Sequence, residues 1–394
     1  MEKYTFVEAL DSFFPNFDGP VHVVTNYCKS FEKDENVHVK IIVPKYKGYK
    51  DTLPYDIMRT KSFGTKKSTY VMAMPGCDKQ VKKYFKENKV DLIHIHSPFT
   101  MGKFMVKMGK KYGIPVVYTF HTKFKSDFER VLKLKSSQKF MMNYIMKVIN
   151  ACDYVLTVSE GSIDTLREYG YKGKVEVIRN GTDLKYPENP DELIKKVNEK
   201  YNLESEENVF LSVGRIVANK RLDVILNSLK IVKDKGYKFK LLVVGAGDYE
   251  NELKSLCTKL GLDDCVIFTG KVMDRELLSA HYLRSDLFLF PSTFDTASLA
   301  PIEAAAMKLP TLMTRGCSTA EIINEDVNGY LANEEDYEDW ANKIISIIED
   351  KKKLKEVSDN AYTQVYRTWD NVVDEVKAKY IECIEDYKSK HIKK

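Results

Sequence analysis

Short apolar runs alternate with amphipathic stretches of helical period along nearly the whole chain, and this alternation limits the possible folds most strongly. Each apolar run has the length of one buried strand, and each amphipathic stretch has the length of a connecting helix. In the best helical example, apolar residues follow the spacing of one buried face: Leu222, Ile225, Leu226, Leu229 and Val232. The pattern predicts an α/β fold of repeated βαβ units around parallel sheets.

The strand candidates are short, apolar and spread over both halves of the chain. They are Val37–Val43, Val90–His96, Pro115–His121, Asp153–Ser159, Val209–Val213, Lys240–Val244, Cys265–Thr269, Asp286–Phe290 and Thr311–Thr314. In doubly wound sheets, ligands bind beyond the carboxyl ends of the strands. We therefore expect the functional residues to lie just after these segments.

A chain of 394 residues is too long for one ordinary domain and suits two. We predict an N-terminal domain over 1–186, a polar linker over 187–207 that contains two prolines, and a C-terminal domain over 208–365. Residues 366–394 are predicted to form an amphipathic helix that packs back on the first domain. Its apolar side holds Val372, Val373, Val376, Tyr380 and Ile384.

The composition is that of a soluble protein, with 43% hydrophobic and 30% charged residues. No run of eighteen or more apolar residues occurs, and the first residues lack the basic and apolar regions of a signal peptide. We therefore expect a cytoplasmic location. The seven cysteines are scattered and include no Cys-x-x-Cys pair, so we expect reduced thiols.

The net charge of +5 is unevenly distributed along the chain. Residues 1–190 hold 32 Lys and Arg against 21 Asp and Glu, a net charge of +11, whereas 191–394 hold 30 against 36, a net charge of −6. A basic half can attract anionic lipid, a phosphorylated acceptor or nucleic acid. A solvated, lysine-rich surface explains the same excess.

The segment Ser212–Arg221 runs from a strand end into a helix and carries two cations. Gly214 allows a ligand to approach the backbone closely, and Arg215 and Lys220 place positive charge near a helix N-terminus. This arrangement suits a diphosphate and would stabilise a departing nucleoside diphosphate. The alternative is that both cations pair with acidic residues at the surface.

The segment Phe290–Met307 contains a strand, an irregular turn and a helix that Pro301 opens. Asp295 and Glu303 are hydrogen-bond acceptors that can face a sugar and two ribose hydroxyls. The backbone amides of residues 298–300, which include that of Ala300, would point at the same ligand. The alternative for Glu303 is compensation of the helix dipole.

Together these two segments resemble the retaining glycosyltransferases of the GT-B fold, glycosyltransferase family 4. The family pairs a G-R-x-x-x-x-K loop, matched here by Gly214, Arg215 and Lys220, with two acids that seven intervening residues separate, matched by Asp295 and Glu303. Further short motifs match at Asp91–Pro98, Thr119–Thr122, Thr157–Glu160, Ile178–Asp183 and Gly270–Val272. The resemblance implies two Rossmann-like, doubly wound parallel-sheet domains that face each other across a cleft.

The resemblance also implies roles for the donor-binding residues. Arg215 and Lys220 would bind the diphosphate, and Glu303 the ribose. Asp295 would bind the transferred sugar together with the amides of Ser298 and Leu299. Position 295 usually holds Glu in the family and position 298 often holds Gly, so both residues depart from the pattern and indicate an altered sugar preference or weaker donor binding.

Three further positions receive roles from the resemblance alone. Val272 would hold the base through its backbone, and His121 would lie beside the anomeric carbon and contribute a hydrogen bond to the transition state. His121, Asp295 and Glu303 are therefore the candidate catalytic residues. Asp18 and Gly19 would form the first loop, near the diphosphate and the acceptor.

Two weaker signals are given a structural interpretation. His94 and His96 alternate on one strand and so share a face, but no carboxylate or cysteine accompanies them at ligand spacing, and we predict no metal site. Gly245-Ala246-Gly247 resembles the start of a dinucleotide fingerprint, but the third glycine position holds Glu250, so we do not predict NAD binding.

The segment Phe120–Lys147 combines lysines with aromatic and aliphatic residues. A basic amphipathic helix of this kind can lie on an anionic membrane surface, which would make the protein peripheral on the inner face of the cell membrane. The alternative is an ordinary helix that packs into its domain with its lysines outside.

We therefore expect a retaining transferase that moves a sugar from a nucleoside diphosphate sugar, a UDP-sugar by preference, to a lipid or saccharide acceptor. Diacylglycerol and a cell-envelope glycan precursor are examples of such acceptors. No cofactor, metal or nucleic acid is expected. Two alternatives stay open: a non-catalytic protein that binds nucleotide sugars or nucleic acid, and a sugar-nucleotide epimerase.

Overall fold

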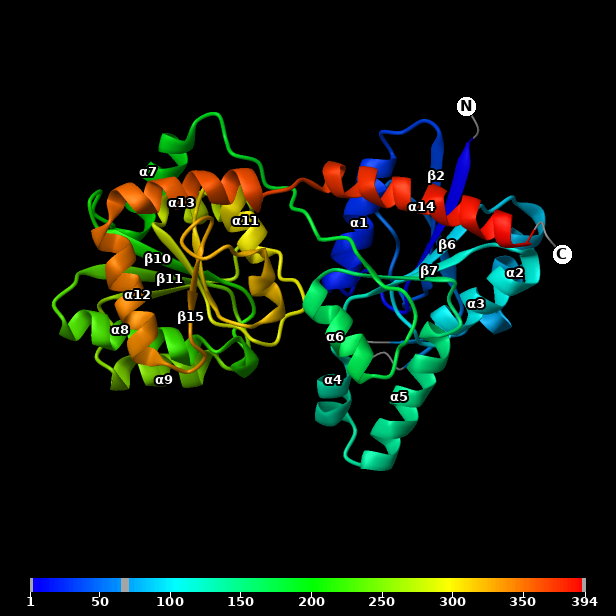
Figure 1. The fold of residues 1–394 in the computed structure, drawn as a ribbon, viewed down its shortest axis with the longest axis horizontal. Coiled ribbons are helices and arrows are strands. Elements are labelled where there is room, and N and C mark those ends of the chain that lie inside the picture. The colour runs from blue at the N-terminus through cyan, green and yellow to red at the C-terminus, as the bar shows by residue number, and fades with distance from the viewer. Residues whose placement is uncertain (1–2, 65–70, 392–394) are drawn as a thin grey trace. The chain divides into compact units, whose positions relative to one another are not determined.

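The computed structural model describes residues 3–64 and 71–391. Contacts divide the chain into two compact units, and each is described by itself: unit 1 is Met1–Asn180 with Trp369–Lys394, and unit 2 is Gly181–Thr368. Each unit contains one large parallel sheet with helices on both faces (Figure 1). The predicted α/β fold with two parallel sheets is therefore confirmed.

The sheet of unit 1 has seven parallel strands in the order β3-β2-β1-β6-β7-β8-β9. Their bounds are β1 Tyr4–Ala9, β2 Val37–Pro44, β3 Asp56–Thr60, β6 Leu92–Ile95, β7 Val116–Phe120, β8 Tyr154–Thr157 and β9 Glu176–Val177. A small antiparallel pair, β4 Ser62–Phe63 and β5 Met72–Ala73, lies outside this sheet. The four strands predicted in this half are confirmed, and the prediction lacked the central strand β1.

Two layers of helices cover the sheet of unit 1. The helices are α1 Gly19–Phe31, α2 Lys79–Glu87, α3 Thr100–Tyr112, α4 Phe124–Val131, α5 Lys135–Ile149, α6 Glu160–Glu168 and α14 Trp369–His391, with a 3-10 turn η1 at Pro75–Cys77. Side chains of α2, α3, α5 and α6 share one hydrophobic core with the sheet. Within the described residues, no helix is long and apolar enough to cross a membrane.

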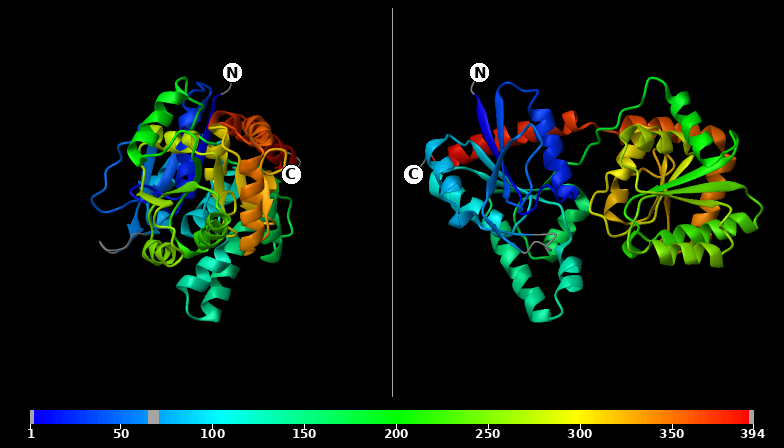
Figure 2. Two further views of the ribbon diagram at one scale, coloured as in Figure 1. Left: turned by 90° about the vertical axis from the view of Figure 1, so that its left-hand side faces the viewer. Right: turned by 180° about the vertical axis from the view of Figure 1, so that it is seen from behind.

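The C-terminal helix α14 belongs to unit 1, as predicted, and packs beside α1 (Figures 1 and 2). All five residues of its predicted apolar side are buried. Two ion pairs with the turn that follows α1, Lys33 with Asp370 and Lys377 with Asp34, fix its direction. The Tyr154 hydroxyl also donates to Asp386 at 2.6 Å, which ties the helix to β8.

The sheet of unit 2 has six parallel strands in the order β12-β11-β10-β13-β14-β15. Their bounds are β10 Asn208–Val213, β11 Phe239–Val244, β12 Val266–Gly270, β13 Leu287–Phe290, β14 Thr311–Thr314 and β15 Tyr330–Ala332. The helices are α7 Pro190–Tyr201, α8 Leu222–Asp234, α9 Glu250–Lys259, α10 Arg275–Arg284, α11 Ala300–Ala306, α12 Tyr337–Glu349 and α13 Lys351–Gln364, with 3-10 turns η2 Ala218–Lys220 and η3 Ser318–Ile322. Helices α8, α9 and α12 share the core on one face, and α7, α10 and α11 the core on the other.

The polar stretch 187–207 differs from the predicted linker, because most of it forms helix α7. Pro190 opens this helix in its first turn, where a missing N–H has no cost. Leu193 and Val197 are buried, and α7 packs against α10 inside unit 2. The division between the units falls instead at Asn180 and at Thr368.

The seven cysteines are all free thiols, in agreement with the prediction from their scattered positions.

Arg221, between η2 and α8, has a backbone φ of +54°, a conformation that favours glycine. Its guanidinium forms ion pairs with Asp223 and Glu335, which hold the residue in this conformation.

We predict that Arg221→Gly is about 1 kcal/mol more stable than Arg221→Ala, because both lose the same ion pairs and only glycine lacks the Cβ that positive φ crowds. The free energy of unfolding from urea titrations provides the comparison. Equal stabilities would mean that the turn relaxes to negative φ once the guanidinium is gone.

Candidate functional site

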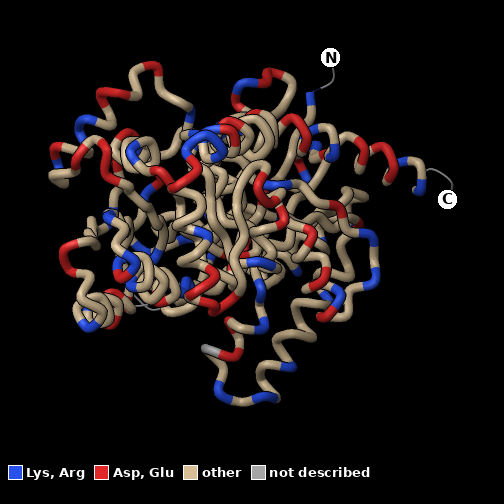
Figure 3. The backbone as a smooth tube through the Cα atoms, turned by 60° about the vertical axis from the view of Figure 1, so that its left-hand side comes forward, with Lys and Arg blue, Asp and Glu red and all other residues tan. Residues whose placement is uncertain are grey.

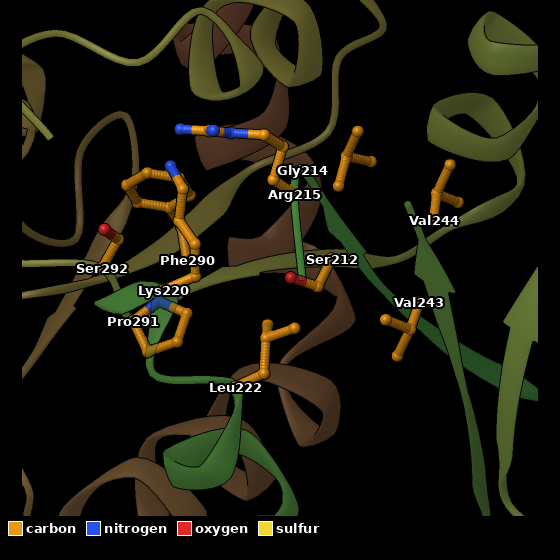
Figure 4. Close-up of a pocket in the computed structure, with 11 residues that line it drawn as sticks. Ser212, Gly214, Arg215, Lys220, Leu222, Val243, Val244, Phe290, Pro291 and Ser292 are labelled. Carbon is orange, nitrogen blue, oxygen red and sulfur yellow. The ribbon is translucent and has the colours of Figure 1, made fainter. Parts of the chain in front are cut away.

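The carboxyl ends of β10, β11 and β13 surround a pocket in unit 2. Its lining residues come from the strand ends and from the loop before α8: Ser212, Val213, Gly214, Arg215, Lys220, Leu222, Val243, Val244, Phe290, Pro291 and Ser292. Arg215, Lys220, Phe290 and Ser292 gather on one side, and Val243 and Val244 lie on the other (Figure 4). The first predicted segment and the start of the second therefore meet at one pocket.

Glycines hold the loops of this pocket close together. A Cβ at Gly245 would lie 1.8 Å from the carbonyl oxygen of Gly214, and one at Gly247 would lie 2.0 Å from that of Ile216. The Ile216 amide donates to the Ala246 carbonyl at 3.0 Å, so the two loops are paired through their backbones. The Gly-Ala-Gly sequence thus serves loop packing, which gives it a role without NAD.

The two predicted cations differ in their surroundings. The Arg215 side chain is exposed and forms no ion pair or hydrogen bond within the described residues. Lys220 Nζ instead lies 2.6 Å from both carboxylate oxygens of Asp295, and Ser292 donates a hydrogen bond to the same carboxylate. The structure therefore joins Lys220 and Asp295, to which the sequence assigned separate parts of the donor.

Glu303 is buried at the start of α11, with both carboxylate oxygens engaged. Tyr282 donates to Oε2 at 3.0 Å, and Arg275 donates to Oε1 at 3.0 Å and also pairs with Asp183. Burial lowers the pKa of Arg275, but the two carboxylates raise it more, and the net shift is upward. Glu303 is thus held in one orientation rather than left to rotate.

The sequence analysis missed Arg275, although it follows Asp274, which caps α10, and lies shortly after the predicted Gly270–Val272 motif. Arg275 connects Glu303 to the Ile178–Asp183 motif through Asp183. Two matched motifs separated by more than a hundred residues therefore share one cation.

The remaining donor candidates lie on loops of unit 2. Val272 is partly buried after β12, and its side chain packs against the hydrophobic core. Ser298 and Leu299 are also partly buried, and Ala300 begins α11. The Ser298 amide donates a long hydrogen bond, 3.5 Å, to the Thr319 hydroxyl. The ligand roles assigned to these residues stay predictions.

His121 follows β7 in unit 1 and contacts the two strand histidines. Its Nε2 lies 2.9 Å from His96 Nδ1, and His96 Nε2 lies 2.7 Å from Glu8 Oε2. His94 and His96 share one face of the sheet as predicted, with ring centroids 3.9 Å apart. Burial lowers the pKa of His96 to about 4, with His94 as a second cause, and burial lowers the pKa of His121 well below its ordinary value.

One part of the metal argument was wrong, because a carboxylate does accompany the histidines. Glu8 lies on β1, the strand missing from the prediction. The carboxylate oxygen that it could offer to a metal ion lies within 4.8 Å of the ring nitrogens that His94 and His96 could offer. Each ring nitrogen of these two histidines also has a hydrogen-bond partner within the protein. We therefore interpret the three residues as a hydrogen-bonded cluster.

Asp18 and Gly19 lie at the start of α1, eight residues or more beyond the end of β1. Asp18 caps the helix, since its carboxylate accepts from the Val21 amide at 3.1 Å and from the Ser12 hydroxyl at 2.8 Å. A side chain at Gly19 would meet nothing within 4 Å. The cap explains Asp18 structurally, and a role toward a ligand stays a prediction.

Two sequence-family models match the chain and together cover most of it. "Glycosyl transferases group 1" matches residues 173–364, and "Glycosyltransferase Family 4" matches residues 17–186. The boundary between the two models falls close to the division between the structural units at Asn180.

Named relatives share about a quarter of the residues. The alpha-monoglucosyldiacylglycerol synthase of Streptococcus pneumoniae is 28% identical over 250 residues, which span 62% of this chain and 56% of that protein. The GDP-mannose-dependent alpha-mannosyltransferase of Corynebacterium glutamicum is 24% identical over 381 residues, 95% of this chain and 88% of that protein. The chain thus spans just over half the length of the first relative.

Solved structures agree in fold. The crystal structure of Anabaena HepE in complex with UDP superposes with a TM-score of 0.76, covering 97% of this chain and all of that chain at 18% identity. This similarity supports the fold alone, and the fold it supports is GT-B.

We predict that the protein loses stability as the pH falls from 6.5 toward 4. The unfolded chain binds protons on histidine near the ordinary pKa, while His96 and His121 stay neutral in the folded chain down to lower pH, so stability rises with pH in this window. Each such group contributes up to about 1.4 kcal/mol per pH unit.

Urea unfolding at several pH values tests this prediction, with His121→Asn as the comparison. The variant should show a shallower dependence of unfolding free energy on pH than the wild type. Identical slopes for the two proteins would contradict the depressed pKa of His121.

Proposed function

We propose that this chain, which belongs to the glycosyltransferases of the GT-B fold, uses a nucleoside diphosphate sugar, specifically a UDP-sugar, and transfers the sugar with retention to a lipid or saccharide acceptor. The main support is the pocket at the strand ends of unit 2, where Arg215 and Lys220 lie beside a glycine-lined backbone. The match to two glycosyltransferase family models also argues against the alternatives of a non-catalytic binder and an epimerase.

The charges of the pocket favour a diphosphate. Arg215 is exposed and can provide a fork of donors, and Lys220 provides a second cation within the same pocket. A diphosphate on Lys220 would compete with Asp295 for the ammonium group, and the Asp295 carboxylate could then accept from sugar hydroxyls. Diphosphate binding and sugar binding would thus be coupled through one ion pair.

Glu303 suits the ribose because its orientation is already fixed. Each carboxylate oxygen accepts one hydrogen bond from protein, and a carboxylate oxygen has lone pairs for a further donor. Arg275 and Tyr282 would therefore hold Glu303 in place while it accepts from ribose hydroxyls. The Anabaena structure contains UDP, which is the basis for naming a UDP-sugar as donor.

The mechanism we propose is a front-face reaction in which the leaving phosphate takes the proton of the acceptor hydroxyl. Arg215 and Lys220 would stabilise the charge that develops on the diphosphate, without a required cofactor or metal. His121 would contribute a hydrogen bond beside the anomeric carbon. Analysis of the product anomer by NMR tests the stereochemistry, and an inverted linkage would refute retention.

A lipid acceptor is supported by the surface of helices α4 and α5. These helices form an arm that extends from unit 1 (Figure 1). Val131 at the end of α4, Leu134 just before α5 and Phe140 within α5 are 66–69% exposed. The same arm carries four exposed lysines: Lys125, Lys133, Lys135 and Lys139. Figure 3 shows Lys and Arg positions in blue along the lower end of the arm. Apolar side chains surrounded by lysines suit an anionic bilayer surface. The named Streptococcus relative is a glycolipid synthase, which agrees with this proposal.

The location that follows is peripheral, on the inner face of the cell membrane, with the body of the protein in the cytoplasm. Acceptors that suit this location are diacylglycerol and lipid-linked precursors of cell-envelope glycans. The excess of positive charge in residues 1–190 would add electrostatic attraction to anionic lipid.

We predict that UDP-sugars raise the melting temperature in a screen that also contains GDP- and ADP-sugars, and that the stabilising sugar is the transferred one.

Arg215→Ala and Lys220→Ala should each lose about 2 kcal/mol of transition-state stabilisation, roughly a 30-fold drop in kcat/KM. Lys254→Ala, on the exposed face of α9, is the matched control and should keep wild-type kinetics. Wild-type rates in both pocket variants would contradict the proposal that Arg215 and Lys220 bind the diphosphate.

We predict that the protein sediments with vesicles containing phosphatidylglycerol and not with vesicles of phosphatidylcholine alone. Phe140→Ser should weaken this binding, whereas Phe63→Ser, which changes an equally exposed phenylalanine (69%) on β4, should leave it intact. Equal binding by both variants would exclude Phe140 of α5 from the contact surface and would contradict the proposed role of this arm.

A further inference from the structure

A line of buried hydrogen bonds connects the last helix of the chain to His121. Tyr380 on α14 donates to Glu8 Oε1 at 2.8 Å, Glu8 Oε2 lies 2.7 Å from His96 Nε2, and His96 Nδ1 lies 2.9 Å from His121 Nε2. Glu8, His94, His96 and Tyr380 are all 2% exposed or less. Water therefore does not compete for these bonds, and their partners must come from the protein.

The contacts of His94 complete the cluster. His94 Nδ1 bonds to the Tyr380 hydroxyl and lies 3.3 Å from Glu8 Oε2, while its Nε2 lies 2.7 Å from the Thr119 hydroxyl. Since the single proton of Tyr380 goes to Glu8, His94 Nδ1 must be the donor to the Tyr380 oxygen. Thr119 then donates to His94 Nε2, and a neutral ring satisfies both contacts.

Matching each hydrogen-bond donor to an acceptor also determines the proton positions on His96 and His121. A carboxylate only accepts, so His96 Nε2 carries the proton that goes to Glu8. In the neutral ring, His96 Nδ1 is then an acceptor, and the proton in the next bond belongs to His121 Nε2. Neutral rings agree with the lowered pKa values of His96 and His121. The lone pair of His121 is thereby assigned to Nδ1.

Each partner in this line is held by packing. Tyr380 packs edge-on against Phe6 of β1, with centroids 4.9 Å apart, and stacks with Phe31 of α1 at 6.2 Å. Tyr27 of α1 covers both strand histidines, at 6.5 Å from His94 and 6.2 Å from His96. The rings therefore have little freedom to turn, and the hydrogen-bond pattern is fixed together with the fold.

We propose that Glu8 is a positioning residue for His121, which it orients and holds in a single tautomer through His96. Glu8 does not touch the substrate, and its effect passes through one neutral imidazole. A buried carboxylate that selects a histidine tautomer is a known device for preparing a catalytic imidazole. The inference rests on the proposed function, in which His121 lies beside the reacting sugar.

A bound metal ion is the competing explanation for the same three residues, because the donor atoms of Glu8, His94 and His96 lie within 4.8 Å. A metal on His96 Nε2 would replace the proton that the hydrogen bond requires. Elemental analysis of the purified protein distinguishes the two explanations. A stoichiometric divalent metal that is lost in His94→Asn would overturn the proposal.

The first test observes the tautomers in the wild-type protein and needs no variant. With nitrogen-15 on the seven histidines, long-range correlation spectra distinguish protonated from unprotonated ring nitrogens, and His121→Asn identifies the signals of His121. We expect His121 to carry its proton on Nε2 and His96 on Nε2. A proton on Nδ1 of either ring would overturn the proposal, whether or not sugar transfer is detected.

The second test uses Glu8→Gln, whose amide offers both a donor and an acceptor to His96. We expect His121 to lose its single tautomer and kcat to fall roughly 10- to 100-fold, with KM for the donor changed less than about twofold. The matched control is Asp91→Asn, a buried carboxylate directly before β6 that accepts from the Thr5 amide at 2.9 Å and lies outside the cluster. The control should keep the tautomer of His121.

A double-mutant cycle separates positioning from general damage to the fold. If Glu8 acts through His121, Glu8→Gln should cause no further loss of kcat in a His121→Asn background. Additive losses would overturn the proposal. Unchanged His121 signals in a folded Glu8→Gln protein would also overturn it, and they would leave the proposed sugar transfer untouched.

Discussion

Parallel strand pairing is the constraint on which the candidate functional residues of each unit depend. In a parallel sheet the carboxyl ends of all strands reach one edge, so residues far apart in the chain become neighbours there. In unit 2 this brings Gly214, Gly245 and Pro291 together from three strands. In unit 1 the same geometry brings His96 and His121 together after β6 and β7.

Glycine decides how closely the strand ends of unit 2 approach one another. Gly245 has a φ of +149°, and its missing side chain leaves room for the Gly214 carbonyl. The loop that carries Arg215 is thereby paired with the loop after β11, and the cation projects from a fixed backbone. A preorganised charge stabilises a developing phosphate charge without a reorganisation cost at the moment of reaction. Glycine at position 245 is thus needed both for the packing of the two loops and for the proposed placement of the Arg215 charge.

The sequence predicted features that depend on local pattern and missed those that depend on pairing between distant residues. Strands such as Thr311–Thr314 and the buried face of α8 follow from periodicity, and the loop motifs follow from short spacings. Glu8 interrupts an apolar run, so β1 was not recognised, and its pairing with His94 depends on register across the sheet. The contacts of Arg275 with Asp183 and Glu303 likewise appear only after folding. Pro190 was interpreted as part of a linker because a proline that opens a helix and one that ends it look alike locally.

The buried charge of Glu8 explains why a helix from the end of the chain belongs to unit 1. A carboxylate in a protein interior costs several kcal/mol unless donors surround it. Burial raises the pKa of Glu8, but His94 and His96 lower it further than burial raises it, so the net shift is downward and the group stays ionised. Another hydrogen-bond donor to Glu8, Tyr380, lies 372 residues away on α14. The first strand therefore depends on the last helix for the charge it buries, and the hydrogen bonds that satisfy this charge are the ones that continue to His121.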